Sequence, residues 1–297
     1  MTDLPEAPGA ALMHDAIRLR ESLGLSNRDA RSEAETLLMR ALGINRARLI
    51  AHPELAAEAA THSTYRESLR RRLAGEPMAY ILAEREFYGC SLKVSPAVLI
   101  PRPETELLVD ASLERLDEKA HDRVLDLGTG SGAIAIAISL QRPHVTVVAA
   151  DVSENALAVA GKNARRLLAA GAERVDLVRS DWFESLPGTC YDLIVSNPPY
   201  VAEADPHLDV GDLRFEPRQA LVAGKTGLDH LERIIRGAPA YLNEGGWLLF
   251  EHGYDQAEPC RQLLQDAGFV ELVMERDLAG IPRVSGGRWL TPGPVTG

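Results

Sequence analysis

The segment Arg123-Val-Leu-Asp-Leu-Gly-Thr-Gly-Ser-Gly-Ala133 combines a short apolar strand, a turn with three glycines and the first residue of a helix. The glycines at 128, 130 and 132 lack a Cβ atom, so the backbone can turn tightly there and approach a ligand closely. The helix that follows directs its free N–H groups toward the same place. The next strand ends about 20 residues later at Asp151, whose carboxylate can accept hydrogen bonds from both hydroxyls of a ribose. The segment therefore predicts a strand–turn–helix unit that holds a ribose-containing ligand.

The sequence around this segment alternates between strand-like and helix-like runs. The expected strands are Arg123–Leu127, Val145–Asp151, Val175–Val178, Tyr191–Ser196 and Trp247–Glu251. The expected helices are Ala133–Gln141, Asn155–Leu168, Leu228–Leu242 and Asp255–Ala267. Such alternation is typical of a parallel sheet covered by helices on both faces. The runs Val270–Met274 and Arg288–Leu290 have no helix between them, so we expect an antiparallel last pair in this α/β domain.

The first part of the chain has a different character. Residues 1–95 carry 13 acidic and 13 basic side chains, whereas the rest of the chain carries 30 acidic and 19 basic ones. The segment from Ser26 to Asp29 resembles a helix-capping box, apolar residues then recur at helical spacing, and Gly43 is placed to end that helix. Strand-like alternation first occurs at Cys90–Val94, in a hairpin expected around Phe87–Val94. We therefore expect a small helical bundle that is followed by a short hairpin.

The overall composition is that of a globular protein, with 45% hydrophobic and 25% charged residues. The three cysteines are widely spaced and lack metal-ligand intervals, so we expect neither a disulfide framework nor a bound metal. No apolar run approaches the ~20 residues needed to cross a bilayer, and the N-terminus lacks the features of a secretion signal. The net charge of −11 repels a long phosphate backbone. These features predict a soluble, cytoplasmic protein with no membrane contact and no direct contact with nucleic acid.

Two ligand classes fit the glycine-rich turn. Gly128, Gly130 and Ala133 match the G-x-G-x-x-G/A pattern, so an oxidoreductase that binds a nicotinamide dinucleotide is one candidate. Asp126 and Gly132 complete the pattern D-x-G-x-G-x-G, which resembles the loop of class I S-adenosylmethionine-dependent methyltransferases. An acidic residue suits a cationic sulfonium and an amino group better than a diphosphate. The turn therefore favours S-adenosylmethionine.

A second chemical signal follows the strand Tyr191–Ser196, where the chain continues as Asn197-Pro198-Pro199-Tyr200. The prolines remove two backbone donors, so this strand exit accepts hydrogen bonds and donates few. The Asn197 oxygen and the Pro198 carbonyl can take both N–H protons of a planar –NH₂ group. Such a grip orients the nitrogen lone pair toward a methyl donor and stabilises the positive charge that develops there. Tyr200 can lie against the flat face of the group. The tetrapeptide therefore predicts methyl transfer to an amide or an aryl amine.

The chain resembles the HemK-type family, the peptide chain release factor N5-glutamine methyltransferases, over most of its length. The motifs that carry the resemblance are Gly75-Glu-Pro-Met-Ala-Tyr-Ile81, Glu86-Phe-Tyr-Gly89, Leu99-Ile-Pro-Arg-Pro-Glu-Thr-Glu106, residues 126–132, Asp181-Trp-Phe183, Asn197–Tyr200 and Phe215-Glu-Pro-Arg218. Asn-Pro-Pro-Tyr alone is shared with enzymes that methylate the exocyclic amines of adenine or guanine. The Pro101–Glu106 segment and the helical N-terminal part are more specific to the HemK-type family.

The resemblance implies a Rossmann-like, seven-stranded class I methyltransferase domain with a small N-terminal helical bundle and a hairpin linker. It implies a helical substrate-recognition domain at 1–84, the β-hairpin linker at 85–100 and the catalytic domain at 101–297. The implied reaction transfers a methyl group from S-adenosylmethionine, leaving S-adenosylhomocysteine. The implied acceptor is the N5 amide of the glutamine in the Gly-Gly-Gln motif of class I release factors, which a monomer of this chain would bind.

The resemblance also implies a role for individual residues. The cofactor-binding residues would be Gly128, Thr129, Gly130, Ser131 and Gly132 for the methionine moiety, Asp151 for the ribose, and Trp182, with Asp181 as a further candidate, for the adenine side. Asn197 would be the catalytic residue and would touch both cofactor and acceptor. Pro198, Pro199 and Tyr200 would line the glutamine pocket together with Asn197.

Three alternatives and two motifs stay open. A nucleic-acid methyltransferase would use the same tetrapeptide but needs a basic cleft, a nicotinamide enzyme would use the same turn, and a binding module would have lost its activity. Residues 70–72 are three arginines that form either a solvated helix face or a contact for an acidic partner. The segment Glu251-His252-Gly253 lies at a predicted strand end and receives no role beyond ordinary sheet-end chemistry.

Overall fold

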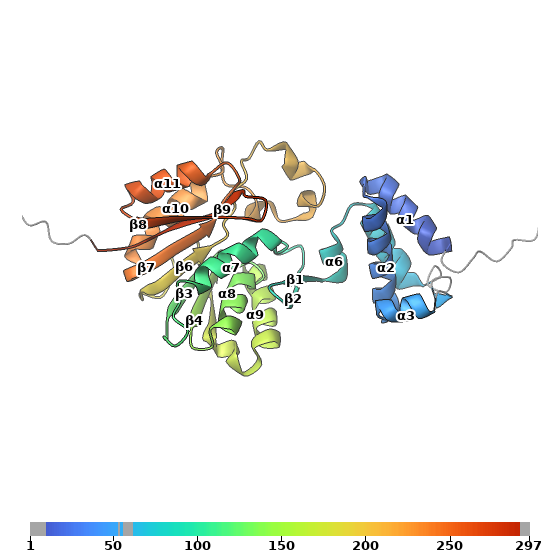
Figure 1. The fold of residues 1–297 in the computed structure, drawn as a ribbon, viewed down its shortest axis with the longest axis horizontal. Helices are drawn as coiled ribbons and strands as arrows, with labels where there is room; N and C mark the ends of the chain where they lie inside the picture. Colours follow the sequence, from blue (N-terminus) through green and yellow to red (C-terminus); the bar gives the residue numbers. More distant parts are fainter. Residues whose placement is uncertain (1–9, 53, 56–61, 292–297) are drawn as a thin grey trace, which may run out of the picture. The chain divides into compact units, whose positions relative to one another are not determined.

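The computed structural model describes residues 10–52, 54–55 and 62–291 of the chain (Figure 1). The chain divides into two compact units. The first unit comprises residues 1–83 and the short segment 211–215, and the second comprises residues 84–210 and 216–297.

The first unit is a helical bundle, as the sequence predicts. Its helices are α1 (Ala10–Leu23), α2 (Asn27–Leu42), α3 (Arg46–Ala51), α5 (Ser63–Leu73) and α6 (Met78–Leu82). At the start of α2, the Ser26 hydroxyl accepts a hydrogen bond from the Asp29 amide, and Gly43 ends the helix with a φ of 66°. Both ends of α2 therefore lie where the capping pattern predicts them. Apolar side chains of α1, α2 and α5 form the core of this unit.

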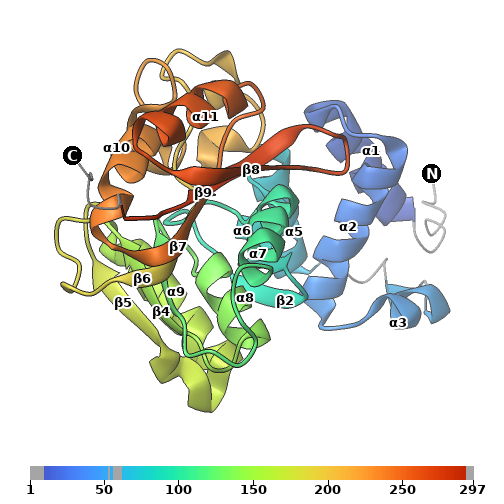
Figure 2. The ribbon, with the colours of Figure 1, turned by 60° about the vertical axis from the view of Figure 1, so that its left-hand side comes forward.

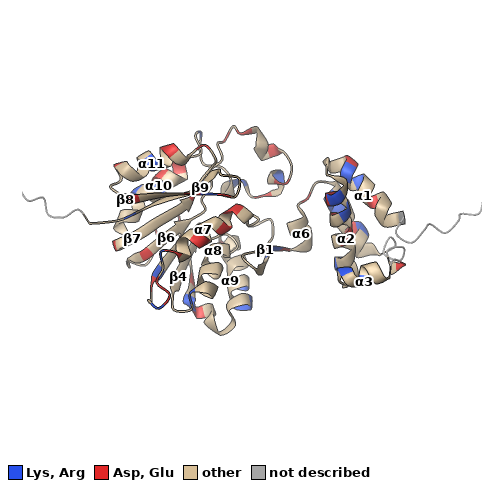
Figure 3. Cartoon of the chain, in the orientation of Figure 1, with Lys and Arg blue, Asp and Glu red and all other residues tan. Residues whose placement is uncertain are grey.

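The arginine run at 70–72 lies in the last turn of α5. Arg70 pairs with Glu67 on the exposed surface. Arg72, in contrast, has a side chain that is only 7% exposed and pairs with Glu33 at 2.8 Å. The interpretation of the run as a solvated helix face is therefore wrong for Arg72, which is part of the bundle. In Figure 3, acidic and basic residues are interspersed over these helices.

The second unit begins with a two-stranded hairpin of β1 (Glu84–Phe87) and β2 (Cys90–Lys93), which pair antiparallel. The hairpin predicted near Phe87–Val94 is thus confirmed. Tyr88 and Gly89 connect the strands with φ values of 49° and 72°. Positive φ at both central residues matches the twist of a two-residue hairpin, and glycine meets this requirement without strain.

A seven-stranded sheet forms the centre of the second unit, in the order β5-β4-β3-β6-β7-β9-β8. Its strands are β3 (Arg123–Leu127), β4 (Thr146–Asp151), β5 (Val175–Arg179), β6 (Tyr191–Ser196), β7 (Leu242–Glu251), β8 (Val270–Arg276) and β9 (Pro282–Arg288). The first five pair parallel, while β9 is antiparallel to both β7 and β8. The strand order changes direction at β3, because β4 lies on one side of it and β6 on the other. Open α/β sheets bind ligands at the carboxyl ends of the strands at such a point.

Helices cover both faces of this sheet, as Figures 1 and 2 show. One face carries α7 (Glu106–Leu113), α8 (Ala133–Gln141) and α9 (Glu154–Leu168), and the other carries α10 (Asp229–Gly237) and α11 (Ala257–Asp266). Short 3-10 helices occupy Pro103–Thr105, Ala169–Arg174, Pro206–Asp209, Leu213–Phe215, Arg218–Ala220 and Ala238–Ala240. Alternate strand residues enter opposite cores, for example Val124 the first and Leu125 the second. The fold is the predicted class I methyltransferase architecture.

Three elements differ from the sequence prediction. The predicted helix Leu228–Leu242 ends at Gly237, because Pro239 follows in a 3-10 turn and Leu242 already begins β7. The predicted strand Arg288–Leu290 is wrong, since β9 occupies Pro282–Arg288 instead. The antiparallel pairing of the last two strands is confirmed. The helix Glu106–Leu113 has no counterpart in the prediction.

The glycines of β9 explain why this strand is hard to recognise. Glycine is rare in strands because it contributes no side chain to the packing. A Cβ atom at Gly286 would lie 2.1 Å from the Leu248 carbonyl oxygen of the neighbouring strand β7. Close approach of β9 to β7 therefore requires the very residue type that lowers strand propensity.

Among the residues that the structure describes, no helix has the length and apolar character that a membrane crossing requires.

Replacing Gly286 with alanine should lower the free energy of unfolding by about 1–3 kcal/mol, because the new methyl group forces β9 away from β7. Urea unfolding followed by circular dichroism measures this change. Gly188→Ala is the matched control, since position 188 has no atom within 4 Å of a new Cβ. Equal stability of the two variants would contradict the close approach of β9 and β7.

Asp126 is a fully buried acid near the end of β3. Its Oδ2 accepts hydrogen bonds from the Thr129 hydroxyl at 2.6 Å and from the Ala135 amide at 3.3 Å. Its Oδ1 has no hydrogen-bond partner among the described residues. Burial raises the pKa of Asp126 to about 7, although both hydrogen bonds act in the opposite direction. Asp126 thus ties the glycine-rich turn to the first turn of α8.

The raised pKa of Asp126 gives a prediction for the pH dependence of stability. The folded state binds the proton of the Asp126 carboxyl more tightly than the unfolded state does. The contribution of this proton to the free energy of unfolding is therefore complete below about pH 4 and is lost as the pH rises through 7. Asp126→Asn removes this dependence, so the variant should gain stability relative to the parent between pH 4 and 8, by up to about 4 kcal/mol. Urea unfolding at several pH values, with exposed Asp255→Asn as the control, measures it. A pH-independent difference between parent and Asp126→Asn would show that Asp126 titrates normally.

Candidate active site

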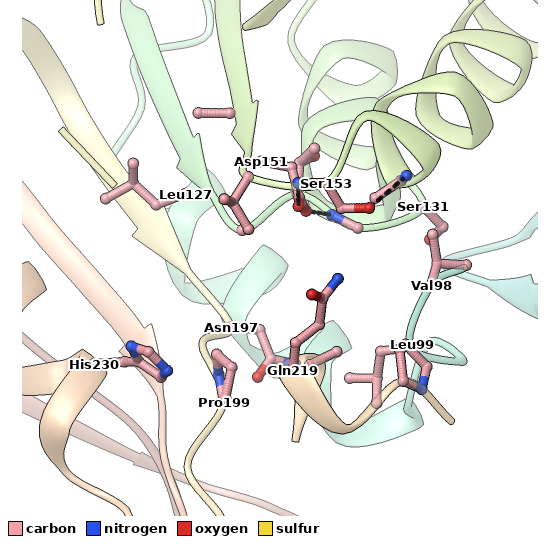
Figure 4. A pocket seen from close by; sticks show the side chains of 18 of the residues that line it. Val98, Leu99, Leu127, Ser131, Asp151, Ser153, Asn197, Pro199, Gln219 and His230 are labelled. Carbon is pink, nitrogen blue, oxygen red and sulfur yellow. Dashed lines mark hydrogen bonds between the residues drawn. The ribbon is translucent and has the colours of Figure 1, made fainter. Parts of the chain in front are cut away.

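A cavity of about 460 Å³ opens at the carboxyl ends of β3, β4 and β6, where the strand order changes direction (Figure 4). The sequence-predicted residues that line it are Gly128, Thr129, Gly130, Ser131, Asp151, Asp181, Trp182, Asn197 and Pro199. The sequence-predicted residues outside the lining are Gly132, Pro198 and Tyr200. In Figure 4, Asp151 and Ser153 lie across the cavity from Asn197 and Gln219. The glycine-rich turn and the Asn-Pro-Pro-Tyr segment therefore face one space, from opposite sides.

Asp151 closes the cavity at the end of β4. Its Oδ2 accepts a hydrogen bond from the Gly130 amide and its Oδ1 one from the Ser153 amide, each at 2.9 Å. A carboxylate offers about four lone-pair directions, so Asp151 keeps acceptor capacity for a ligand. Burial raises the pKa of Asp151, against the effect of these backbone donors. The arrangement is suited to a ligand with two neighbouring hydroxyl groups.

Gly132 serves the fold behind the cavity. It caps α8 with a φ of 82°, a conformation that glycine adopts without strain. A Cβ atom there would lie 3.2 Å from the Cβ of Ala160 on α9. The third glycine of the turn therefore permits α8 and α9 to pack closely. Asp126 also lies outside the cavity lining, so the expectation that its charge faces a sulfonium is not met by its position below the turn.

Trp182 forms one wall of the cavity after β5. Its ring lies beside Gly128, where a Cβ atom would be 3.6 Å from the indole, and its centroid is 5.2 Å from that of His230. His230 on α10 also lines the cavity, although no sequence pattern marks it as a site residue. Burial lowers the pKa of His230, which favours the neutral imidazole. Asp181 at the same wall is paired with Arg233 at 3.2 Å. This wall offers flat rings to a planar ligand.

Asn197 lines the opposite side of the cavity. Its side-chain nitrogen donates a hydrogen bond to the Thr105 hydroxyl at 2.9 Å. Its Oδ1 is buried and has no hydrogen-bond partner among the described residues. A buried polar atom without a partner costs about 1–3 kcal/mol, so this oxygen is suited to a donor that a ligand supplies.

Thr105 and Glu251, to which the sequence assigned no individual role, hold this side of the cavity. The Thr105 hydroxyl donates to Glu251 Oε2 at 2.6 Å, and the Tyr200 hydroxyl donates to Glu251 Oε1 at 3.1 Å. Burial raises the pKa of Glu251. Burial and the neighbouring carboxylate of Glu251 raise the pKa of Tyr200. Glu251 therefore joins the Pro101–Glu106 segment to the Asn-Pro-Pro-Tyr segment. The sequence features that could have pointed to this contact are the two motifs that contain Thr105 and Tyr200.

The remaining walls are fixed by similar bridges between distant segments. Buried Glu216 accepts a hydrogen bond from the Ile100 amide at 2.9 Å and pairs with Arg102. Gln256 donates to the Tyr200 carbonyl at 3.0 Å, which holds the chain after the prolines. Buried Asn163 donates to the carbonyls of Lys93 and Ser131, both at 2.9 Å, and so links the hairpin to the glycine-rich turn.

Within the described part of the chain, no group of three or more His, Cys, Asp or Glu side chains is arranged to hold a metal ion. The side chains that line the cavity can bind and orient organic groups. Asp151 can accept hydrogen bonds from hydroxyl groups, Trp182 offers a flat ring, and Asn197 offers an amide oxygen as an acceptor.

Comparison with known proteins identifies the family. The family model of the methyltransferase small domain matches residues 104–224, and the model of the PrmC N-terminal domain matches residues 17–82. The release factor glutamine methyltransferase of Bordetella pertussis is 54% identical over 258 residues, which cover 86% of this chain and 94% of that protein. That of Xylella fastidiosa strain 9a5c is 48% identical over 263 residues, or 89% of this chain and 94% of the relative.

A solved structure supports the fold independently. The methyltransferase from Pyrococcus furiosus matches with a TM-score of 0.52 at 16% identity, over 76% of this chain and 99% of that chain. With the identity and coverage of the curated relatives, the chain belongs to the family of release factor glutamine methyltransferases, and it is an enzyme of the protein-(glutamine-N5) methyltransferase class.

Proposed function

We propose that this enzyme transfers a methyl group from S-adenosylmethionine to the side-chain amide nitrogen of the glutamine in the Gly-Gly-Gln motif of class I release factors. The observation that carries the proposal is Asn197, which lines the same cavity as the glycine-rich turn and whose buried Oδ1 has no hydrogen-bond partner among the described residues. The names of the relatives support the release factor as the partner.

The residues present fit S-adenosylmethionine, which when bound supplies an electrophilic methyl group on a sulfonium. Gly128, Gly130 and their neighbours expose backbone to the cavity, where side chains would exclude the methionine moiety. Asp151 keeps acceptor capacity for the ribose hydroxyls. Trp182 offers its ring to the adenine.

Asn197 and Pro198 would activate the acceptor nitrogen. An amide nitrogen is a poor nucleophile because its lone pair is delocalised into the carbonyl group. The Asn197 oxygen and the Pro198 carbonyl, by accepting both N–H protons, orient the lone pair toward the methyl group and stabilise the growing positive charge. Neither acceptor titrates, and the nitrogen can lose its proton to solvent after the methyl group has been transferred. Pro199 and Tyr200 would hold the glutamine side chain against this pair.

Charge argues against the alternative of nucleic-acid methylation. Residues 96–297 carry 30 acidic and 19 basic side chains, and in Figure 3 the two kinds are interspersed over the second unit. A surface of this composition repels the phosphate backbone that such an enzyme must bind.

A methylation assay tests the proposal directly. The enzyme and S-adenosylmethionine with a labelled methyl group should label an intact class I release factor at one glutamine. A release factor with the Gly-Gly-Gln glutamine changed to alanine should take up no label, because the acceptor nitrogen is gone. DNA and RNA serve as parallel acceptors. Label in the alanine variant, or only in nucleic acid, would refute the proposed substrate.

Two substitutions should separate binding from chemistry. Asn197→Ala removes the acceptor for the amide, so kcat should fall about 10²–10³-fold, while S-adenosylhomocysteine affinity changes only a few-fold. Asp151→Ala removes the ribose acceptors, so the dissociation constant for S-adenosylhomocysteine should rise about 10–100-fold. Steady-state kinetics and calorimetry measure both, with exposed Glu184→Ala as the control. Near-parental turnover in Asn197→Ala, or unchanged affinity in Asp151→Ala, would remove the proposed role of that residue.

A further inference from the structure

We propose that Glu251 is a positioning residue that acts through Thr105 to fix which edge of the Asn197 amide faces the cavity. The inference rests on the proposed function, because it explains how the acceptor oxygen for the glutamine amide is kept in place. Glu251 lies outside the cavity lining and would touch neither substrate nor cofactor.

The three side chains form a continuous chain of hydrogen bonds. Asn197 Nδ2 is 2.9 Å from Thr105 Oγ1, which is 2.6 Å from Glu251 Oε2. Thr105 is 4% exposed and Glu251 is 1% exposed, so water does not compete for these groups. The register of the sheet brings the ends together, because Ser196 of β6 lies opposite Phe250 of β7 and the next residues are Asn197 and Glu251.

The direction of each hydrogen bond follows from the donors available. A carboxylate only accepts, so the single hydroxyl proton of Thr105 must point to Glu251. The Thr105 oxygen is then an acceptor toward Asn197, and the NH₂ end of the Asn197 amide must turn to it. The oxygen of the same amide is left without a hydrogen-bond partner among the described residues, so it is available to the substrate amide. The negative charge of Glu251 thus selects one of the two possible orientations of Asn197.

The selected orientation matters for catalysis. In the opposite orientation, Asn197 would present N–H donors to the N–H donors of the glutamine amide, and neither proton would be held. The second oxygen of Glu251 is occupied by the Tyr200 hydroxyl at 3.1 Å, which keeps the carboxylate in place. Burial raises the pKa of Glu251 and the charge of Glu104 acts in the same direction, whereas the hydroxyls of Thr105 and Tyr200 and the charge of Arg283 favour the ionised form.

Three variants test the relay in the full-length enzyme. Thr105→Val keeps the shape but removes the hydroxyl, and Glu251→Gln keeps the shape but lets a donor face Thr105. Each should lower kcat by about 10–100-fold, with S-adenosylhomocysteine affinity within threefold of the parent. The double variant should lose no more than the larger single effect, because both act through one path. Thr105→Ser retains the hydroxyl and should restore most of the rate, whereas Thr146→Val controls for the substitution at an exposed site.

A second measurement is independent of the substrate. In the ¹⁵N-labelled enzyme, the Asn197 side-chain NH₂ resonances, identified by their absence in Asn197→Asp, should shift in Glu251→Gln, because Thr105 connects the two side chains by hydrogen bonds. The same resonances should be close to those of the parent in Thr105→Ser. Unchanged Asn197 resonances in both Glu251→Gln and Thr105→Val would overturn the inference. If the Asn197 resonances shift as expected but the enzyme does not methylate release factors, the proposed substrate is refuted and the relay is not.

Discussion

Burial of carboxylates at one edge of a parallel sheet is the constraint on which the rest of this structure depends. Asp126, Asp151 and Glu251 lie at or near the carboxyl ends of β3, β4 and β7, and burial raises the pKa of each. Their desolvation is partly offset by hydrogen bonds from Thr129, Gly130 and Thr105. The acids therefore fix the segments that surround the cavity to the strand ends.

The sequence predicts the parts of this arrangement that are encoded locally. The glycine turn at 128–132, the alternation of strands and helices, and the cap of α2 each depend on residues within a few positions of one another. Asn197 and Asp151 could be placed because both follow recognisable strands. The likeness to a known family supplied the domain order and the protein substrate, neither of which the spacing of residues contains.

The contacts that complete the site could not be read from the sequence, because they join distant positions. Thr105 and Glu251 are 146 residues apart, and no local pattern marks them as partners. His230 lines the cavity from α10. The sequence pattern of α10 is explained by its apolar face, so the pattern does not indicate that His230 belongs to the site. The predicted position of the last strand is wrong for a different reason. Gly286 lowers the local strand propensity of β9, but only glycine allows β9 to approach β7 closely.

The fixed register of β6 and β7 has a consequence for how the chain can change length. Ser196 and Phe250 are paired, so Asn197 and Glu251 emerge side by side from neighbouring strands. Successive strand residues point to opposite faces of the sheet, so inserting or deleting one residue within either strand would turn one partner away from the other. Insertions and deletions in homologous enzymes should therefore be found in the loops between strands. They should be rare in the last residues of β6 and β7 before the active site.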